Sequence, residues 1–244
     1  MDVFDLRDRP TTTIGGLTGG LVDHDRNGAT LFVNLDSGTT IDEPGLEIFL
    51  LGGRLDVAGR QLGPQDYALL GSPAEVRADA QALAWVPEKQ PVGAARVETA
   101  VGAGWRAPAL GSAPGMLFRP LRTEERVDEV EGRRVTGTPR GFRRLTVLAP
   151  GWCERRCEVH AGCREENIVL AGDLMVCGEG RGVLGPGSVL VNEVGLRHGP
   201  MATRGGAAIL ISCDFWMSVD WSEASEADLA AIDGYLAEGP GWLR

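Results

Sequence analysis

Two segments of the chain repeat one pattern of short apolar runs, and this repeat limits the folds that the chain can adopt. The first, LEIFLLGGRLDVAGRQLGPQDYALL, covers residues 46–70, and the second, ENIVLAGDLMVCGEGRGVLGPGSVLV, covers residues 166–191. Each contains an apolar run, a glycine, a second short run and a Leu-Gly-Pro turn before a final apolar run. The aligned glycines, Gly53 and Gly172, are roughly 120 positions apart, which is far longer than the period of a solenoid repeat. The repeat therefore predicts a duplicated domain.

Short segments that are typical of β-strands recur along the chain, and most are bounded by Gly, Pro, Asp or Asn. They are residues 29–35, 47–51, 67–70, 82–86, 144–148, 167–170, 188–191 and 207–213. Many short strands and almost no helical periodicity indicate a jelly roll or sandwich. We therefore expect an all-β fold of two tandem domains, residues 1–95 and residues 96–244.

One short helix is expected near the C-terminus, in the sequence SEADLAAIDGYLAEG. Ser225 followed by Asp228 makes a capping box, which is typical of a helix start. Leu229, Ile232 and Leu236 recur at helical spacing and fall on one face. We expect this helix to pack on a barrel or on a partner.

Residues 122–144, RTEERVDEVEGRRVTGTPRGFRR, are dense in charge and poor in apolar side chains. This composition favours a solvated loop or hairpin, so we expect an exposed excursion between the repeats. A lid or a dimer arm is the alternative.

The composition also restricts the partners of the chain. The formal net charge is −10 at pH 7, whereas nucleic acid and anionic membranes require a basic face, so neither is expected as a partner. No apolar run is long enough to span a bilayer, and the N-terminus MDVFDLRDRP lacks the apolar segment of a secretory signal. Five cysteines at irregular spacing fit a reducing compartment better than a disulfide framework. We expect a cytoplasmic protein that binds a small molecule.

Two glutamates and two histidines in the second repeat can converge on one point. Side chains alternate along a strand, so Glu158 and His160 point to the same face. Glu165 follows after a short turn, and His198 follows a second turn at Gly195. In an antiparallel jelly roll, strands joined by such turns can place these four side chains around one internal position.

The spacing of these residues resembles the two motifs of the cupins, which are jelly-roll barrels that bind metals. His160, four residues, Glu165, six residues and Gly172 match the latter part of the first cupin motif. Gly195, two residues and His198 match the middle of the second. Most of the chain, and residues 150–214 above all, is similar to bacterial bicupins related to the cupin of ChrR-type anti-sigma factors. The resemblance implies two tandem cupin domains and a bound metal.

The chain departs from the cupin motifs at three points. Glu158 occupies the position of the first histidine, Glu193 occupies the position of a proline, and no asparagine follows His198 at the usual spacing. The first repeat has no histidine at any motif position, and its Leu46 aligns with Glu165. The N-terminal domain is therefore expected to bind no metal and to serve in structural support and homodimerisation.

The chemistry of the four side chains agrees with the resemblance. Neutral imidazole and carboxylate bind Fe(II), Mn(II), Zn(II) and Ni(II). His160, Glu165 and His198 form a two-histidine, one-carboxylate set, which leaves positions open for O2 or a chelating substrate, so Fe(II) is the favoured ion. Glu158 is expected to be a fourth ligand or a nearby base. Without an ion the two carboxylates would repel each other, so one should bind a proton. A metal-free relic of such a site is the alternative.

Other residues near the motifs have simpler interpretations. Glu166 is one residue out of phase with Glu165 and is expected to face outward. His24 lies between two aspartates and is expected on the surface or in a turn. Four cysteines lack zinc-finger spacing and are expected to be buried free thiols. They are Cys153, Cys157, Cys163 and Cys177.

Two arginines in the sequence LRHGPMATRGG, Arg197 and Arg204, are candidates for binding an anionic substrate at the barrel mouth. Arginine suits this role because its paired donors match a carboxylate. Exposed, solvated arginines are the alternative.

Three functions fit the sequence. The first is a metal-dependent enzyme, preferably a dioxygenase or C–C cleaving oxygenase, that acts on a small oxygenated molecule such as a β-diketone or a hydroxy-keto acid. A non-redox isomerase or hydrolase would use the same ligands. The second is a non-catalytic ligand or metal sensor, as in the ChrR-type relatives. The third is a structural bicupin with a vestigial site.

Overall fold

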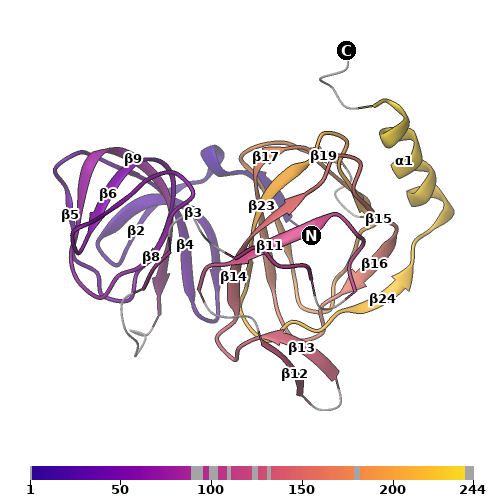
Figure 1. Cartoon of the computed structure of the whole chain (residues 1–244), viewed down its shortest axis with the longest axis horizontal. Coiled ribbons are helices and arrows are strands. Elements are labelled where there is room, and N and C mark those ends of the chain that lie inside the picture. The colour runs from indigo at the N-terminus through magenta and orange to yellow at the C-terminus, as the bar shows by residue number, and fades with distance from the viewer. Residues whose placement is uncertain are drawn as a thin grey trace. The chain divides into compact units, whose positions relative to one another are not determined.

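The chain forms two compact units, which Figure 1 draws from indigo at the N-terminus to yellow at the C-terminus. The computed structural model describes residues 2–88, 96–98, 104–108, 111–122, 126–130, 133–178 and 182–239. The N-terminal unit is Leu6–Gly104, and the C-terminal unit is Met1–Asp5 together with Trp105–Arg244.

Strand pairing explains why these units differ from the predicted boundary at residues 95 and 96. β1 (Asp2–Asp5) pairs with β20 (Ser188–Asn192), so the start of the chain belongs to the C-terminal unit. β10 (Arg96–Glu98) pairs with β8 (Tyr67–Leu69), so the N-terminal unit continues beyond residue 95.

The N-terminal unit is built on one antiparallel sheet with the path β10-β8-β6-β9-β4-β3-β2, and off this path β5 pairs with β9 and β7 pairs with β6. The strands are β2 (Thr11–Ile14), β3 (Leu17–Asp25), β4 (Gly28–Leu35), β5 (Thr40–Ile41), β6 (Glu47–Val57), β7 (Arg60–Leu62), β8, β9 (Ala74–Pro87) and β10, preceded by a short 3-10 helix, η1 (Leu6–Asp8). Inward-facing Leu, Ile, Val and Ala side chains from these strands form one apolar core.

The C-terminal unit encloses its core between several sheets. The largest has the order β1-β20-β17-β23-β14-β11, and the smaller ones are β15-β22-β18-β19, β21-β16-β24 and the hairpin β12-β13. The strands are β11 (Met116–Pro120), β12 (Arg126–Val130), β13 (Arg133–Gly137), β14 (Phe142–Leu148), β15 (Cys153–Glu154), β16 (Arg156–Val159), β17 (Glu165–Gly172), β18 (Leu174–Val176), β19 (Gly182–Leu184), β20, β21 (Arg197–His198), β22 (Met201–Ala202), β23 (Ala207–Cys213) and β24 (Asp220–Glu223). Ile209 and Ile211 of the largest sheet share one core with Leu174 and Val176, so the sheets pack face to face as in a jelly roll.

The strand predictions hold because each of the eight segments lies largely within an observed strand, and β23 has the predicted limits. The helix also forms where it was expected. α1 (Glu226–Ala237) begins after the N-cap Ser225, whose side chain accepts a hydrogen bond from the backbone N–H of Asp228. None of the described helices has the length and apolar character needed to cross a lipid bilayer.

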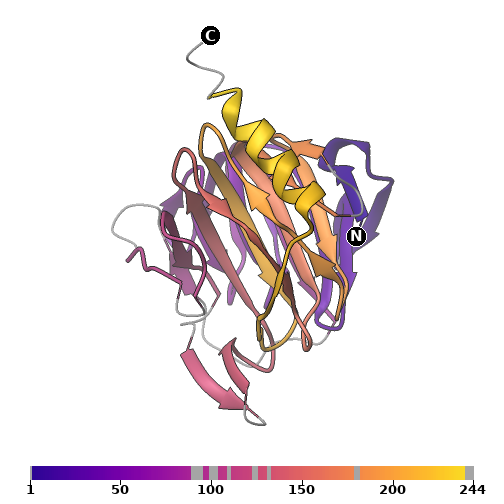
Figure 2. The same ribbon diagram turned by 90° about the vertical axis from the view of Figure 1, so that its right-hand side faces the viewer.

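The buried face of α1 differs from the predicted one. Ile232 is buried as expected, but Tyr235 is buried beside it, while Leu229 and Leu236 are only half-buried. The Tyr235 hydroxyl donates a hydrogen bond to Asp173, which draws the ring onto the barrel. Figure 2 shows α1 lying across the strands of the C-terminal unit.

The predicted exposed excursion at residues 122–144 is correct for only part of its length. β12 and β13 form a hairpin that extends away from the barrel (Figures 1 and 2). However, Val135 and Thr136, near the C-terminal end of β13, are buried. Arg143 and Arg144 are also buried, within β14. Charge density predicts solvent exposure poorly here because the arginines belong to a central strand of the sheet.

Candidate metal centre

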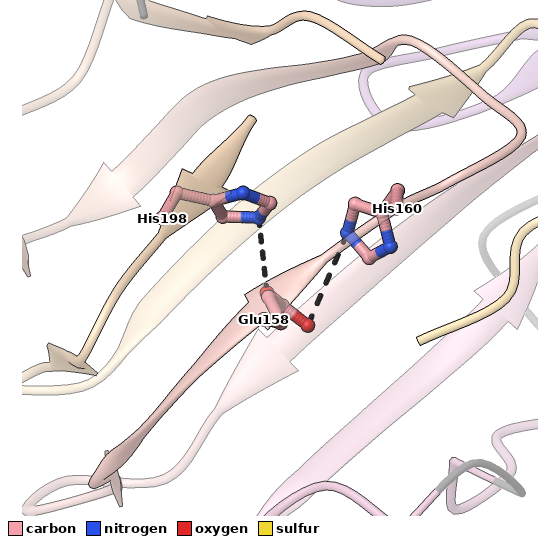
Figure 3. Close-up of side chains that lie close together, drawn as sticks. All are labelled: Glu158, His160 and His198. Carbon is pink, nitrogen blue, oxygen red and sulfur yellow. Dashed lines mark ion pairs between the residues drawn. The ribbon is translucent and has the colours of Figure 1, made fainter. Parts of the chain in front are cut away.

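Glu158, His160 and His198 converge because of the register of two short strands. Glu158 on β16 lies directly opposite His198 on β21, and directly paired residues point to the same face. His160 follows Glu158 by two positions, just beyond the end of β16. One ligand atom from each of the three side chains lies within 4.8 Å of the others. Figure 3 shows the Glu158 carboxylate between the two imidazoles.

Glu165, the first residue of β17, completes the predicted set. Its Oε2 atom is 3.6 Å from Nε2 of His160 and 3.5 Å from Nε2 of His198. The Glu158 carboxylate is 3.3 Å from Nε2 of His198 and 3.9 Å from Nε2 of His160. Ligand bonds of about 2.0–2.2 Å leave two ligands of one ion roughly 3–4 Å apart, so these distances fit a single transition-metal ion.

Both imidazoles are oriented by backbone carbonyls. Nδ1 of His160 is 3.0 Å from the carbonyl oxygen of Ser218, and Nδ1 of His198 is 3.1 Å from that of Leu196. A carbonyl can only accept, so each Nδ1 atom carries a proton and donates it. In the neutral tautomer the lone pair is then on Nε2, which has no hydrogen-bond partner among the described residues. Metal-binding histidines are held in this way.

The Glu165 carboxylate is fixed by two buried amides. Its Oε2 atom accepts hydrogen bonds from Nδ2 of Asn167 at 2.9 Å and from Nδ2 of Asn192 at 3.0 Å. The sequence interpretation missed both asparagines. Asn167 could have been found, because it follows Glu165 by two positions on the same strand and so shares its face. Asn192 depends on the pairing of β17 with β20, in which it lies opposite Glu165.

The charges of the cluster are balanced through the imidazoles. Burial lowers the pKa of His160, but the Glu165 carboxylate outweighs burial and raises it to about 9. Burial also lowers the pKa of His198, but the nearby Glu158 and Glu165 carboxylates outweigh burial and raise it to about 10. Burial raises the pKa of Glu165, but the two imidazoles hold it well below its ordinary value. The expectation that a carboxylate would take a proton is therefore not met at Glu165, where the imidazoles carry the protons. A divalent ion that displaced two such protons would leave the net charge of the cluster unchanged.

A cavity of about 160 Å³ lies against this cluster inside the C-terminal unit. Glu158, His160 and Glu165 form part of its wall. Much of the remaining wall is apolar, with side chains such as Met116 and Ile209. An apolar cavity with a few converging polar groups is the usual form of a small-molecule site.

The two arginines predicted to bind substrate are not among the residues that line this cavity. The exposed Arg197 guanidinium donates to the Ser222 hydroxyl and to the backbone carbonyl of Glu223. Arg204 forms an ion pair with Glu238 at 2.6 Å and stacks on the ring of Tyr235, so it contacts helix α1. Their positions do not support the predicted anion clamp.

The remaining sequence candidates are not members of the cluster. Glu166 is on the face of β17 opposite to Glu165, as its phase predicted, although its side chain is buried. His24 is exposed on β3. Leu46, which aligns with Glu165, is fully buried in the apolar core of the N-terminal unit.

All five cysteines are free thiols. Of the four that were predicted to be buried free thiols, Cys157, Cys163 and Cys177 are buried, whereas Cys153 is only half-buried. The Cys157 thiol donates to the backbone carbonyl of Gly199 at 3.1 Å, so it points away from Glu158 on the same strand. The sulfur atoms therefore contribute no ligand to the cluster that the described residues form.

Several solved structures resemble the chain along most of its length. A cupin 2 conserved barrel domain protein from Leptotrichia buccalis superposes with a TM-score of 0.54 at 10% identity, over 89% of this chain and 96% of that one. The chain has the cupin fold.

Two further neighbours extend this likeness. A candidate dioxygenase from Nostoc punctiforme gives a TM-score of 0.69 at 14% identity and covers 92% of this chain and 87% of its own. Quercetin 2,3-dioxygenase from Acinetobacter baumannii gives a TM-score of 0.53 at 14% identity, and the superposition covers 98% of this chain and 89% of that one. No protein-family model and no curated protein sequence matches the chain. At these identities the cupin likeness concerns the fold.

Proposed function

We propose that the chain is a metal-dependent enzyme that acts on a small oxygenated molecule, and that it is an oxygenase of the dioxygenase or C–C cleaving type. The observation that carries this proposal is the convergence of two carbonyl-anchored imidazoles and two carboxylates beside a cavity whose wall includes Glu158, His160 and Glu165. A structural barrel gains nothing from three buried ionisable groups beside the half-buried Glu158, because burying charge is costly unless it serves binding or chemistry.

His160, Glu165 and His198 are the residues proposed to hold the ion. Both imidazoles present an Nε2 atom without a hydrogen-bond partner among the described residues, and two amides restrain the carboxylate. A two-histidine, one-carboxylate set is typical of non-haem Fe(II) sites, so Fe(II) is the favoured ion, and Mn(II), Zn(II) or Ni(II) would accept the same donors. When bound, such an ion would polarise a chelating substrate, and iron would add redox chemistry with O2.

Glu158 is proposed as a fourth ligand or as the proton acceptor. Its side chain is 15% exposed, and its polar partners among the described residues are the two imidazoles, whereas Glu165 is also tied to two amides. Glu158 therefore has fewer hydrogen-bond restraints than Glu165, and it lines the cavity where a substrate would lie. A carboxylate in this position can remove a proton from a carbon or hydroxyl next to a carbonyl.

The names of two neighbours favour oxygen chemistry over the alternatives. One is a candidate dioxygenase and the other a quercetin 2,3-dioxygenase, and both superpose over more than nine-tenths of this chain. A non-redox isomerase or hydrolase would use the same ligands, and a sensor would use the same cavity. These alternatives differ from an oxygenase in whether O2 is consumed.

The experiment is substrate-dependent O2 uptake by protein loaded anaerobically with Fe(II), measured with an oxygen electrode over a panel of β-diketones and hydroxy-keto acids. The wild type should consume O2 with at least one compound, and His198→Ala should not. His24→Ala removes an exposed histidine of the N-terminal unit and should behave as the wild type. If a compound is converted without O2 uptake, the activity is an isomerase or hydrolase. If compounds bind but none is converted, the sensor hypothesis replaces the enzyme.

A further inference from the structure

Thr146 lies within strand β14 and lines the cavity beside the candidate metal centre. Phe118 on β11 and Ile209 on β23 lie directly opposite Thr146, one on each side. Leu148 follows it by two positions on the same strand. Directly paired residues, and residues two apart on one strand, share a face of the sheet, and all three neighbours also line the cavity. The Thr146 side chain therefore lies among apolar side chains on the cavity wall.

The Thr146 hydroxyl has no hydrogen-bond partner among the described residues. The residue is fully buried. The nearby Arg144 packs its guanidinium on the rings of Phe118 and Phe142 and does not donate to this hydroxyl. A hydroxyl that is buried without a partner costs free energy, and most such groups in folded proteins are paired. A ligand in the cavity would supply the missing partner.

The N-terminal unit has a valine at the position equivalent to Thr146. In each unit, a row of three paired residues on neighbouring strands begins four residues after the position where the repeats align. The rows are Val169, Ile209 and Thr146 in the C-terminal unit, and Leu50, Ala82 and Val33 in the N-terminal unit. Val33 is 1% exposed and belongs to the apolar core. Valine has nearly the shape of threonine without the hydroxyl, so the barrel does not require a polar group here.

Thr146 and Glu165 lie at a distance from each other along the cavity wall. The row that contains Thr146 meets β17 at Val169, four residues after Glu165, and β14 is two strands away from β17. At about 4.8 Å between strands and about 3.3 Å per residue, the backbones of Thr146 and Glu165 are roughly 16 Å apart. Ile209 and Ile211 of the intervening strand line the cavity between them. A single ligand that contacts both Thr146 and the metal centre is therefore elongated, with an apolar middle.

We propose that Thr146 is a specificity-determining residue, and that the substrate is an elongated molecule with a hydroxyl group at the end remote from the metal centre. A hydroxyl is favoured over a carbonyl or a carboxylate, because it both donates and accepts and so meets both unused capacities of the threonine hydroxyl. The chelating oxygens lie at the other end, beside Glu158 and His160. This role depends on the proposed function, because it takes the cavity to be the active site. The substrate is thereby narrowed from oxygenated molecules in general to β-diketones with an apolar body and a distal hydroxyl.

The test uses 1-phenylbutane-1,3-dione and the two forms of it that carry a hydroxyl at the para or the meta position of the ring. Dissociation constants are measured by isothermal titration calorimetry on Zn(II)-loaded protein, with the zinc content and the melting temperature recorded for every variant. The wild type should bind one of the hydroxylated forms about 3- to 10-fold more tightly than the parent compound, the gain typical of one added hydrogen bond.

Thr146→Val should abolish or invert this preference. The variant leaves the ligand hydroxyl buried without a partner, whereas the parent compound, which needs none, should bind as tightly as before or more tightly. A substitution that merely disturbed the cavity would weaken the binding of all the compounds alike. The melting temperature should be unchanged or higher, because an unpaired hydroxyl of the protein is removed.

Three further variants complete the comparison. Thr146→Ser keeps the hydroxyl and should keep the preference. Thr146→Ala removes the same hydroxyl and decides the matter if the valine variant does not fold. Thr40→Val makes the same change at an exposed position of β5 in the N-terminal unit and should behave as the wild type.

The outcomes separate the role of Thr146 from the proposed function. Protein that takes up Zn(II) but binds all three compounds equally, or that keeps an undiminished preference in Thr146→Val, overturns the role of Thr146 and leaves the proposed metal centre intact. Protein that takes up no Zn(II), yet shows the preference and loses it in Thr146→Val, supports the role of Thr146 and contradicts the metal enzyme. A wild type that binds none of the compounds overturns the role of Thr146.

Discussion

The two units of the chain share one strand pattern, but their interiors differ at the position where the repeats align. Leu46 precedes β6 and is fully buried in an apolar core, whereas Glu165 begins β17 and is buried among two histidines and two asparagines. The backbone requirements are the same in both units. Gly53 and Gly172 both adopt positive φ angles, of 83° and 78°.

The features that both units share are those that the barrel fold requires, and the features found in one unit alone are candidates for a functional site. An added Cβ at Gly53 or Gly172 would meet a neighbouring backbone carbonyl oxygen, at 2.3 Å and 1.9 Å respectively, so the glycine is required by the fold in both units. A charged side chain is not required, because the N-terminal unit builds its core with leucine at the aligned position. The polar cluster of the C-terminal unit is therefore attributed to binding and chemistry.

The largest effect on metal binding is expected when Glu165 is replaced by leucine, the residue at the aligned position of the N-terminal unit. Glu165→Leu places the side chain of the N-terminal unit in the C-terminal one, and it should lower metal affinity by more than about 100-fold, because a ligand and the partner of two amides are lost together. Competition with a chromogenic chelator measures the affinity. A variant that binds metal as tightly as the wild type would show that Glu165 is not a ligand.

The shared glycines should respond alike. Gly53→Ala and Gly172→Ala each force a side chain onto a left-handed backbone against a carbonyl, so each should destabilise its own unit by roughly 2–5 kcal/mol. Hydrogen exchange read separately over β6 and β17 measures the change. Loss of protection at only one of the two sites would break the structural equivalence of the repeats.

Removal of the ion should destabilise the C-terminal unit but not the N-terminal unit. An ion that binds only the folded state stabilises it by about 2.7 kcal/mol when its free concentration is 100 times its dissociation constant. Chelation should therefore speed hydrogen exchange in β16, β17 and β21, and leave β6 and β9 unaffected. Equal effects in both units would contradict a site confined to the C-terminal one.

The smallest effect is expected at a residue that only positions a ligand. Asn192→Ala removes one of the two amides that hold the Glu165 carboxylate, and such a loss typically weakens metal binding by about 10-fold or somewhat more. Asn34→Ala, at an exposed position of the N-terminal unit, is the control. Unchanged affinity in Asn192→Ala would mean that Asn167 alone orients the carboxylate.

Local patterns in the sequence predicted much of this molecule. Alternating and punctuated apolar runs located the strands, the spacing of Ser225 and Asp228 located the start of α1, and the phase of Glu158 and His160 placed them on one face. Each of these depends on a few neighbouring residues. The position of His198 near Glu158 was predictable because His198 follows the turn at Gly195, and such turns bring neighbouring antiparallel strands together.

Features that depend on pairing between distant strands were missed. Asn192 reaches Glu165 only through the register of β17 and β20, and Arg144 reaches the cavity only because β14 lies two strands from β17. The sequence favoured Arg197 and Arg204 because they are near His198 along the chain, but neither lines the cavity. The protonation of the imidazoles was also missed, since it depends on the distances between four charged groups.

We propose that the C-terminal unit holds one divalent ion on Glu158, His160, Glu165 and His198. The most direct test is the metal content of protein purified without added metal or chelator, measured by inductively coupled plasma mass spectrometry beside His160→Ala, His198→Ala and the control His24→Ala. We expect close to one Fe, Mn, Zn or Ni per chain in the wild type and in His24→Ala, and little in the other two variants. Wild-type protein that is empty and takes up no ion on reconstitution, or equal metal in all four proteins, would contradict it.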